Sequence, residues 1–164
     1  MSFAAGQRLL INRNIEVAVF QNTPRQILEQ GLVYDRCDIG IVTDMVSTDG
    51  YQDHYLSSAE HMRKVLRTQV DVVLQHGCAV LNADDEQVAT LAEYSDGAVI
   101  FYAENEQNER LQQHRQNAAR VVFLREGVVV MAEGVRELQP ISMQAVADME
   151  AGEASVVLPA VAAA

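Results

Sequence analysis

The sequence has no tryptophan, few aromatic residues and a single lysine, Lys64. Because aromatic residues are sparse, we expect an aliphatic core of Val, Leu, Ile and Ala, and 164 residues are enough for one domain with such a core. The formal net charge of −11 repels phosphate backbones and anionic lipid headgroups, which argues against nucleic-acid and membrane partners. A single nucleotide is compatible with this charge, because backbone N–H groups or Mg²⁺ hold phosphates in acidic proteins.

Cysteine is also scarce, since the chain has only Cys37 and Cys78. Their spacing is not that of a metal site, and both flank apolar runs, which predicts reduced and buried thiols. The first residues lack the long apolar region of a signal peptide, and no apolar run approaches the length of a membrane span. We therefore expect a cytoplasmic protein.

Apolar runs alternate with helical patterns along the chain. Four runs predict buried strands, at 15–20, 39–44, 78–83 and 97–103. Helices are predicted between them, the longest capped by Ser57 or Ser58 and running to about Gln75. The stretch RVVFLREGVVVMAE predicts a β-hairpin around Arg125-Glu126-Gly127. The expected fold class is α/β, a mostly parallel open sheet with helices on both faces and a hairpin near the C-terminal part.

The stretch CAVLNADD (78–85) leaves an apolar strand and enters an amide and two carboxylates. In open parallel sheets, ligands collect outside the carboxyl ends of the strands, where Asn82, Asp84 and Asp85 are expected. These side chains can contact a nucleotide or a metal-bound group. They can equally serve as the N-cap of the helix that follows, since an Asx side chain satisfies free N–H groups there.

Two other places carry candidate chemistry. Asp53-His54 in a polar loop is either a metal or acid–base pair or a solvated loop histidine. Lys64 and Arg67 can share a helix face and bind phosphate, or be ordinary surface charge. The chain contains no GxxxxGK[ST] phosphate-binding loop and no GxSxG motif.

The order of the motifs resembles the Mur-ligase-like portion of cyanophycin synthetase, most closely the proteobacterial type. The segments that carry the resemblance are NIEVAVFQNTPRQILEQGLVYDRCDIGIVTD, the DH pair, RTQVDVVLQHGCAVLNADD, GAVIFYA and RVVFLREGVVVMAEG. The resemblance implies that 1–164 is a partial Mur-ligase central domain, without the P-loop part and the C-terminal domain. It also implies ATP-dependent amide ligation with Mg²⁺, in which arginine is joined to the side-chain carboxylates of an aspartate polymer through an acyl phosphate.

The resemblance further implies roles for single residues. Asn82 matches the family asparagine at the adenine edge, with Asp85 beside it in the cofactor site. His54 and Gln21 fall at metal-binding positions, although Gln21 is neutral where the family usually has glutamate. Arg67 lies near the modified catalytic lysine of many Mur ligases.

Without a P-loop, we expect this chain alone to be inactive and to bind Mg²⁺-ATP weakly or not at all. The alternative is a non-catalytic interaction protein, or a remnant of a ligase, that docks on a full-length synthetase or forms a homo-oligomer.

Overall fold

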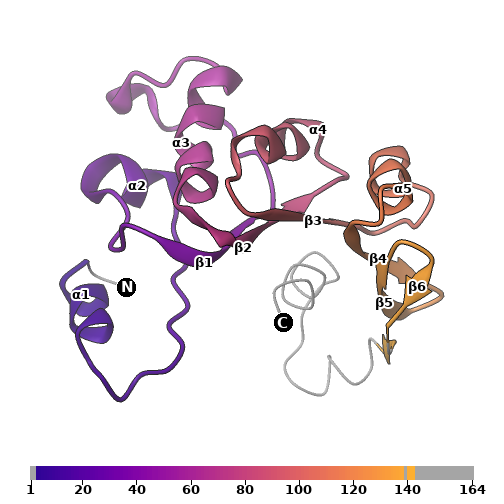
Figure 1. Cartoon of the computed structure of the whole chain (residues 1–164). Helices are drawn as coiled ribbons and strands as arrows, with labels where there is room; N and C mark the ends of the chain where they lie inside the picture. The colour runs from indigo at the N-terminus through magenta and orange to yellow at the C-terminus, as the bar shows by residue number, and fades with distance from the viewer. Residues whose placement is uncertain (1–2, 139, 143–164) are drawn as a thin grey trace.

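The structure, a computed structural model, describes residues 3–138 and 140–142 (Figure 1). Within these residues seven strands form one sheet in the order β1-β2-β3-β4-β5-β6, and β7 pairs with β5. The strands are β1 (Cys37–Val42), β2 (Val73–Asn82), β3 (Ala98–Ala103), β4 (Arg120–Arg125), β5 (Val128–Glu133), β6 (Arg136–Glu137) and β7 (Ile141–Ser142). The helices are α1 (Phe3–Leu10), α2 (Pro24–Gln30), α3 (Ala59–Asp71), α4 (Glu86–Ala89) and α5 (Glu109–Gln116), with 3₁₀ turns η1 (Gln52–His54) and η2 (Thr90–Tyr94).

The strands from β1 to β4 run parallel, with Val80 of β2 opposite Ile41 of β1 and Ile100 of β3. Their order in the sheet follows their order in the chain, so each connection moves by one strand in the same direction. Because such crossovers are right-handed, the connecting helices fall on one face. Figure 1 shows α2, α3, α4 and α5 above the sheet and α1 below it, near β1. The predicted parallel open sheet with helices on both faces is confirmed.

Both faces of the parallel strands are apolar. Leu81, Phe101 and Phe123 are buried between the sheet and the helices. Val80 and Tyr102 are buried on the opposite face. Burial on both sides explains why these strands read as continuous β-branched runs rather than as alternating patterns.

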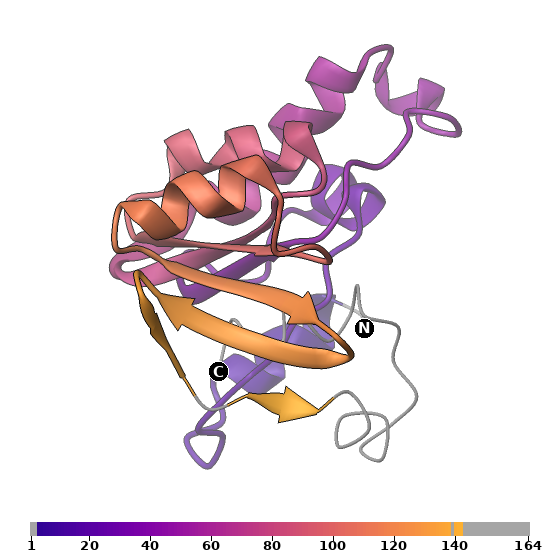
Figure 2. The same cartoon turned by 90° about the vertical axis from the view of Figure 1, so that its right-hand side faces the viewer.

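The predicted hairpin is present at the end of the parallel part of the sheet. β4 and β5 pair antiparallel, with Arg125 opposite Val128. The two residues between them, Glu126 and Gly127, have φ values of 50° and 77°, as a type I′ turn requires. Figure 2 shows this hairpin beside the parallel strands.

Helix starts follow the capping signals of the sequence. Thr23 and Gln26 form a capping box at the start of α2, with Pro24 as its first residue. Ser58, one of the two predicted caps, accepts a hydrogen bond from the backbone N–H of His61 and begins α3.

The predicted end of this long helix is wrong. We expected it to reach Gln75 and to stop at His76-Gly77, but α3 ends at Asp71 and β2 begins at Val73. Val73 pairs with Cys37 of β1 and is fully buried. Apolar residues at 70, 73 and 74 suit a helix as well as a strand, and the neighbouring strand decides between them.

The predicted strand at 15–20 is also wrong, since this segment has no strand pairing in the part of the chain that the structure describes. Val17 and Val19 are 80% and 84% exposed. The segment connects α1, below the sheet, with α2, above it, so it passes the edge at β1 (Figure 1). A strand needs a hydrogen-bonded neighbour, and among the described residues β1 pairs only with β2.

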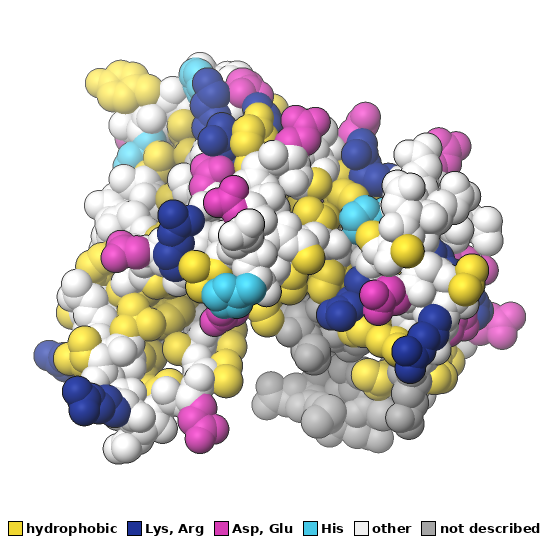
Figure 3. All heavy atoms as spheres, in the orientation of Figure 1, with side chains coloured by type: hydrophobic (Ala, Val, Ile, Leu, Met, Phe, Trp, Pro, Cys, Tyr) yellow, Lys and Arg dark blue, Asp and Glu magenta, His cyan; other side chains and the backbone are white. Residues whose placement is uncertain are grey.

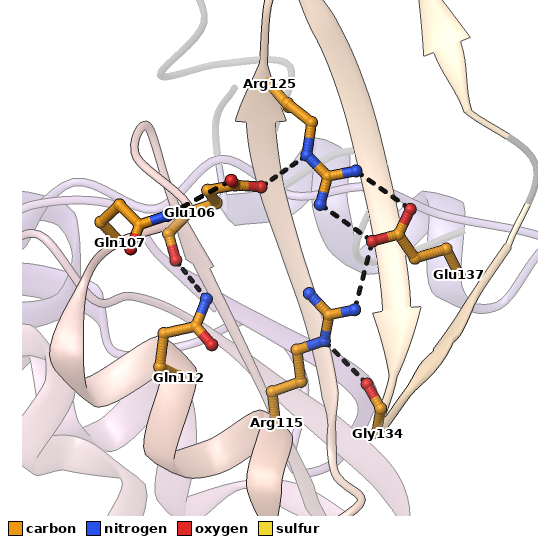
Figure 4. Close-up of polar contacts among 7 residues, drawn as sticks. All are labelled: Glu106, Gln107, Gln112, Arg115, Arg125, Gly134 and Glu137. Atoms are coloured by element: carbon orange, nitrogen blue, oxygen red, sulfur yellow. Dashed lines mark hydrogen bonds and ion pairs between the residues drawn. The ribbon is translucent and has the colours of Figure 1, made fainter.

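A network of two arginines and two glutamates ties the hairpin to the rest of the sheet (Figure 4). Arg125 contacts Glu137 of β6 at 2.9 and 3.1 Å and Glu106, in the loop after β3, at 2.5 Å. Arg115 of α5 donates to Glu137 at 3.1 Å and to the carbonyl oxygen of Gly134 at 2.7 Å. Both guanidinium groups also lie over the ring of Phe123. The shared carboxylate of Glu137 thus joins α5, β4 and β6.

Replacing Gly40 with alanine is expected to destabilise the protein by about 3 kcal/mol, because α3 packs directly on β1 at this position. An added Cβ would lie 2.5 Å from the carbonyl oxygen of Gln69 and 2.8 Å from Cγ2 of Val73. Urea unfolding measures the change. The exposed neighbour variant Asp38→Ala is the control and should stay near wild type; equal stability of both variants would contradict the close packing.

Replacing Glu137 with glutamine is expected to destabilise the protein at neutral pH but not in acid. Hydrogen bonds from Arg125, and then from Arg115, lower the pKa of Glu137 below its ordinary 4.5. Because the folded protein holds this proton less tightly than the unfolded chain, the stabilisation is present above pH 4.5 and is lost as the pH falls through the lowered pKa. Urea midpoints of the two proteins should therefore converge in acid. Glu133→Gln, an exposed change on β5, is the control at pH 7, and an equal loss of stability in both variants would contradict the role of the Glu137 network.

Candidate functional site

The carboxyl ends of β1, β2 and β3 form a polar rim around Asn82. The Asn82 side-chain amide donates to the carbonyl oxygen of Thr43 at 2.9 Å, and its Oδ1 accepts from the backbone N–H of Asp84 at 2.9 Å. The amide therefore links the ends of the first two strands. One N–H and one lone pair of the carboxamide remain for a ligand, and the residue is only half-buried.

Asp85 has a structural task at this rim. One carboxylate oxygen accepts the backbone N–H groups of Gln87 and Val88, so Asp85 is the N-cap of α4. The other oxygen accepts the N–H of Met45 at 2.8 Å. The capping alternative for this stretch is thus confirmed at Asp85, which also binds the backbone of Met45 in the loop after β1.

Asp84 fastens the rim on its other side. Its carboxylate accepts the backbone N–H of Glu104 at 2.7 Å and the side-chain amide of Asn108 at 2.9 Å. Asn108 in turn caps α5 through the N–H of Leu111. Sequence reasoning missed Asn108, although an asparagine five residues after a strand and directly before a helix is a capping signal.

The rim is strongly anionic. Burial raises the pKa of the Tyr102 hydroxyl, and the carboxylates of Asp44, Asp84, Asp85 and Glu104 raise it further. The hydroxyl reaches the carbonyl oxygen of Thr43 at 3.4 Å. Such a rim suits a neutral hydrogen-bonding group, whereas it repels a triphosphate.

His54 lies elsewhere, in η1, beside α2. Its Nε2 is 3.6 Å from a carboxylate oxygen of Glu29 and 3.6 Å from one of Asp53, and Arg25 stands among these groups. Hydrogen bonding to Arg25 holds the pKa of Asp53 below its ordinary value. Sequence reasoning missed Arg25, because its contacts lie 28 and 29 residues away.

Gln21 lines a cavity of about 430 Å³ between α1 and α2, together with Phe20, Thr23 and Gln26. The cavity walls are neutral side chains. A carboxamide without carboxylate neighbours is a weak ligand for Mg²⁺, which prefers charged oxygens. The structure thus places Gln21 and His54 in different surroundings.

Arg67 lies on α3, where its Nε donates to Asp71 at 3.0 Å. Its guanidinium lies 3.9 Å from the ring centre of Tyr94, which Arg63 also contacts through the hydroxyl at 3.2 Å. This side chain has ion-pair and stacking partners within the fold.

The predicted site residues thus occupy four places, and only Asn82 and Asp85 share one. The arrangement of His54 and Gln21 does not fit Mg²⁺, and the described residues contain no group of three His, Cys, Asp or Glu side chains arranged to hold a metal ion. The base-binding role of Asn82 is compatible with the N–H group and the lone pair that its carboxamide leaves unused.

In the described parts of the chain, no helix is long and apolar enough to cross a membrane.

Comparison with known proteins gives a consistent set of relatives, although no protein-family model matches the chain. It is 35% identical over 132 residues to the cyanophycin synthetase of Crocosphaera subtropica, an alignment that covers 80% of this chain and 15% of that protein. The cyanophycin synthetase of Synechocystis sp. is 35% identical over 127 residues, which is 77% of this chain and 14% of that protein. That of Geminocystis herdmanii is 28% identical over 150 residues, or 85% and 17%.

The chain spans about 15% of the length of the relatives it matches. The proteobacterial subtype stays a prediction. Most of this chain is a partial cyanophycin synthetase-like domain.

Proposed function

We propose that this chain supplies the nucleotide-base contact of an ATP-dependent amide ligase of the cyanophycin synthetase kind. The observation that carries the proposal is the 35% identity to two cyanophycin synthetases over more than three quarters of the chain. In the complete reaction, ATP transfers its γ-phosphoryl group to an aspartate side-chain carboxylate and ADP leaves. The arginine amine then attacks the acyl phosphate, an amide bond forms, and phosphate and a proton are released. Because ATP is consumed, we place this function in the cytoplasm.

The geometry at Asn82 supports recognition of the base. A carboxamide offers a donor and an acceptor side by side, which complements the adjacent N–H and ring nitrogen of adenine. The bonds of Asn82 to Thr43 and Asp84 fix the plane of the carboxamide. A fixed amide loses little conformational entropy when a ligand binds.

The phosphates require groups that the rim does not offer. Asp44, Asp84 and Glu104 surround Tyr102 with negative charge. Arg67, the proposed catalytic side chain, is paired with Asp71 and reaches phosphate only if it leaves this partner. We therefore infer that the chain by itself contacts the base and that other parts of a complete ligase hold the triphosphate and Mg²⁺.

Titration with adenosine and with ATP, followed by amide NMR, tests the proposal. Both ligands should shift the amide signals around Asn82 with weak affinity, in about the millimolar range, and ATP should bind more weakly than adenosine because the anionic rim repels its phosphates. Mg²⁺ should change little, and Asn82→Ala should abolish the shifts. The control Gln87→Ala alters an exposed neighbour on α4 and should bind as wild type does.

Sub-micromolar binding of ATP would contradict base-only recognition, since it requires a phosphate cradle. Absence of any shift at the rim with both nucleosides and nucleotides would overturn the proposed function itself.

A second candidate function is docking on a larger ligase, and the exposed segment at 15–20 favours it. Val17 and Val19 are 80% and 84% exposed and nearby Ile11 is 79% exposed, and the segment passes β1, whose outer edge is unpaired among the described residues. In Figure 3 hydrophobic side chains gather on the left, below β1 and around α1. An apolar stretch beside an open edge strand suits the addition of a strand from a partner.

Binding of this chain to a purified full-length cyanophycin synthetase tests the docking function. The double variant Val17→Asp and Val19→Asp should weaken binding by about tenfold or more, because two valines lose their apolar contacts. Val135→Asp is the matched control, since Val135 is 99% exposed in the turn before β6. Equal binding of all three proteins, or none by the wild type, would reject this function; a shift to a homodimer would show self-association instead.

A further inference from the structure

The segment at 15–20 has the sequence of a strand but no partner strand. Ile15, Val17 and Val19 recur at every second position, a pattern typical of a strand, and the two valines are 80% and 84% exposed. In the part of the chain that the structure describes, the backbone from 16 to 21 makes no hydrogen bond. The peptide groups of this stretch are therefore open to pairing with another chain.

A cavity of about 430 Å³ lies beside the end of this segment, between α1 and α2. Phe3 and Phe20 form an apolar part of its wall, and the carboxamides of Gln21 and Gln30 form a polar part. All of the described residues that line it are uncharged, although the chain as a whole carries a net charge of −11. The volume lies in the range of ligand sites, and the wall disfavours charged groups because it offers them no counter-ion.

The wall of the cavity is held by close packing. A Cβ added at Gly6 of α1 would lie 3.0 Å from Cγ2 of Val33 and 3.3 Å from Cε1 of Phe20, so α1 packs directly on these two side chains. The ring of Phe20 also lies 5.6 Å from that of Tyr34, and Asn22 donates to the Tyr34 hydroxyl at 2.9 Å. A cavity whose wall is fixed before binding loses little entropy when it takes a ligand.

We propose that an extended strand of a partner ligase pairs with residues 16–21 and places one large uncharged side chain in the cavity between α1 and α2. When a peptide adds to an open strand, main-chain hydrogen bonds supply the affinity, and a pocket beside the strand selects the side chain. Both elements of such a site lie together here, since Phe20 belongs to the unpaired segment and also lines the cavity.

The chemistry of the partner strand follows from the wall of the cavity. A Phe or Leu side chain fits the apolar part, whereas Asp or Arg would lose its hydration without gaining a counter-ion. Gln21, whose carboxamide makes no hydrogen bond within the described residues, can bind a peptide group of the incoming strand. This inference rests on the proposed docking function and names the segment that docks. It does not involve the rim at Asn82.

Amide NMR with blocked pentapeptides tests the inference. The probe acetyl-Thr-Thr-Phe-Thr-Thr-amide should bind weakly, in about the millimolar range, and should shift the amide signals of residues 16–21 and of the cavity wall. Replacing the central Phe of the peptide with Ala should weaken binding about tenfold or more, because the apolar contact is lost. Replacing it with Asp should abolish binding, because the cavity offers this charge no partner.

Blocking the cavity provides a matched pair of variants. Gln21→Trp places a large ring where the partner side chain would lie. It should weaken binding of the Phe peptide and of purified full-length cyanophycin synthetase about tenfold or more. Gln113→Trp makes the same change at an exposed position of α5, away from the cavity, and should bind both as wild type does. Circular dichroism verifies that each variant remains folded.

Equal binding of the Phe, Ala and Asp peptides, or no shift at 16–21 with any of them, would overturn the inference. Undiminished binding of the synthetase to Gln21→Trp would also overturn it and would leave the docking function standing. If the wild type bound the Phe peptide but not the synthetase, the ligase would be rejected as the partner, and with it the docking function.

Discussion

β2 has hydrogen-bonded neighbours along both edges, and its register with β1 and β3 brings the carboxyl ends of these three strands together. With Val80 opposite Ile41 and Ile100, the three strands end at the same level, so Thr43, Asn82 and Glu104 meet at one rim. The order of the strands also decides the layers. Right-handed connections that advance in one direction place α3, α4 and α5 on a single face, and α1 is left to the other.

The rim combines structural and ligand-binding demands in a small space. Asp85 and Asp84 satisfy backbone N–H groups that would otherwise be unpaired at the ends of buried strands and at helix starts. The carboxylates that do this also make the rim anionic. Asn82 is neutral and keeps one N–H donor and one acceptor lone pair unused. It is therefore the side chain at the rim that is best suited to bind a ligand. The same carboxylates thus stabilise the ends of the strands and make the rim selective for a neutral ligand.

The arginine side chains have different partners in the three clusters that contain them. Arg125 and Arg115 share Glu137 and clamp the hairpin, whereas Arg67 stacks on Tyr94 beside Asp71. Arg25 is surrounded by two carboxylates and an imidazole. With a single lysine and a large acidic excess, the protein meets the acceptors of these clusters with the planar guanidinium, whose five N–H donors form a rigid fork.

Local signals in the sequence determined the α/β class, the starts of α2 and α3, and the hairpin at Glu126-Gly127, because caps and turn residues act over a few positions. The resemblance to cyanophycin synthetase was likewise readable from motif order. Tertiary structure decided what depends on distant partners. Val73 became strand because Cys37 lies beside it, and the segment at 15–20 stayed unpaired because it crosses from the α1 side of the sheet to the α2 side instead of running along β1 (Figure 1). The contact of Arg25 with His54 joins residues 29 positions apart, and no local pattern encodes such a meeting.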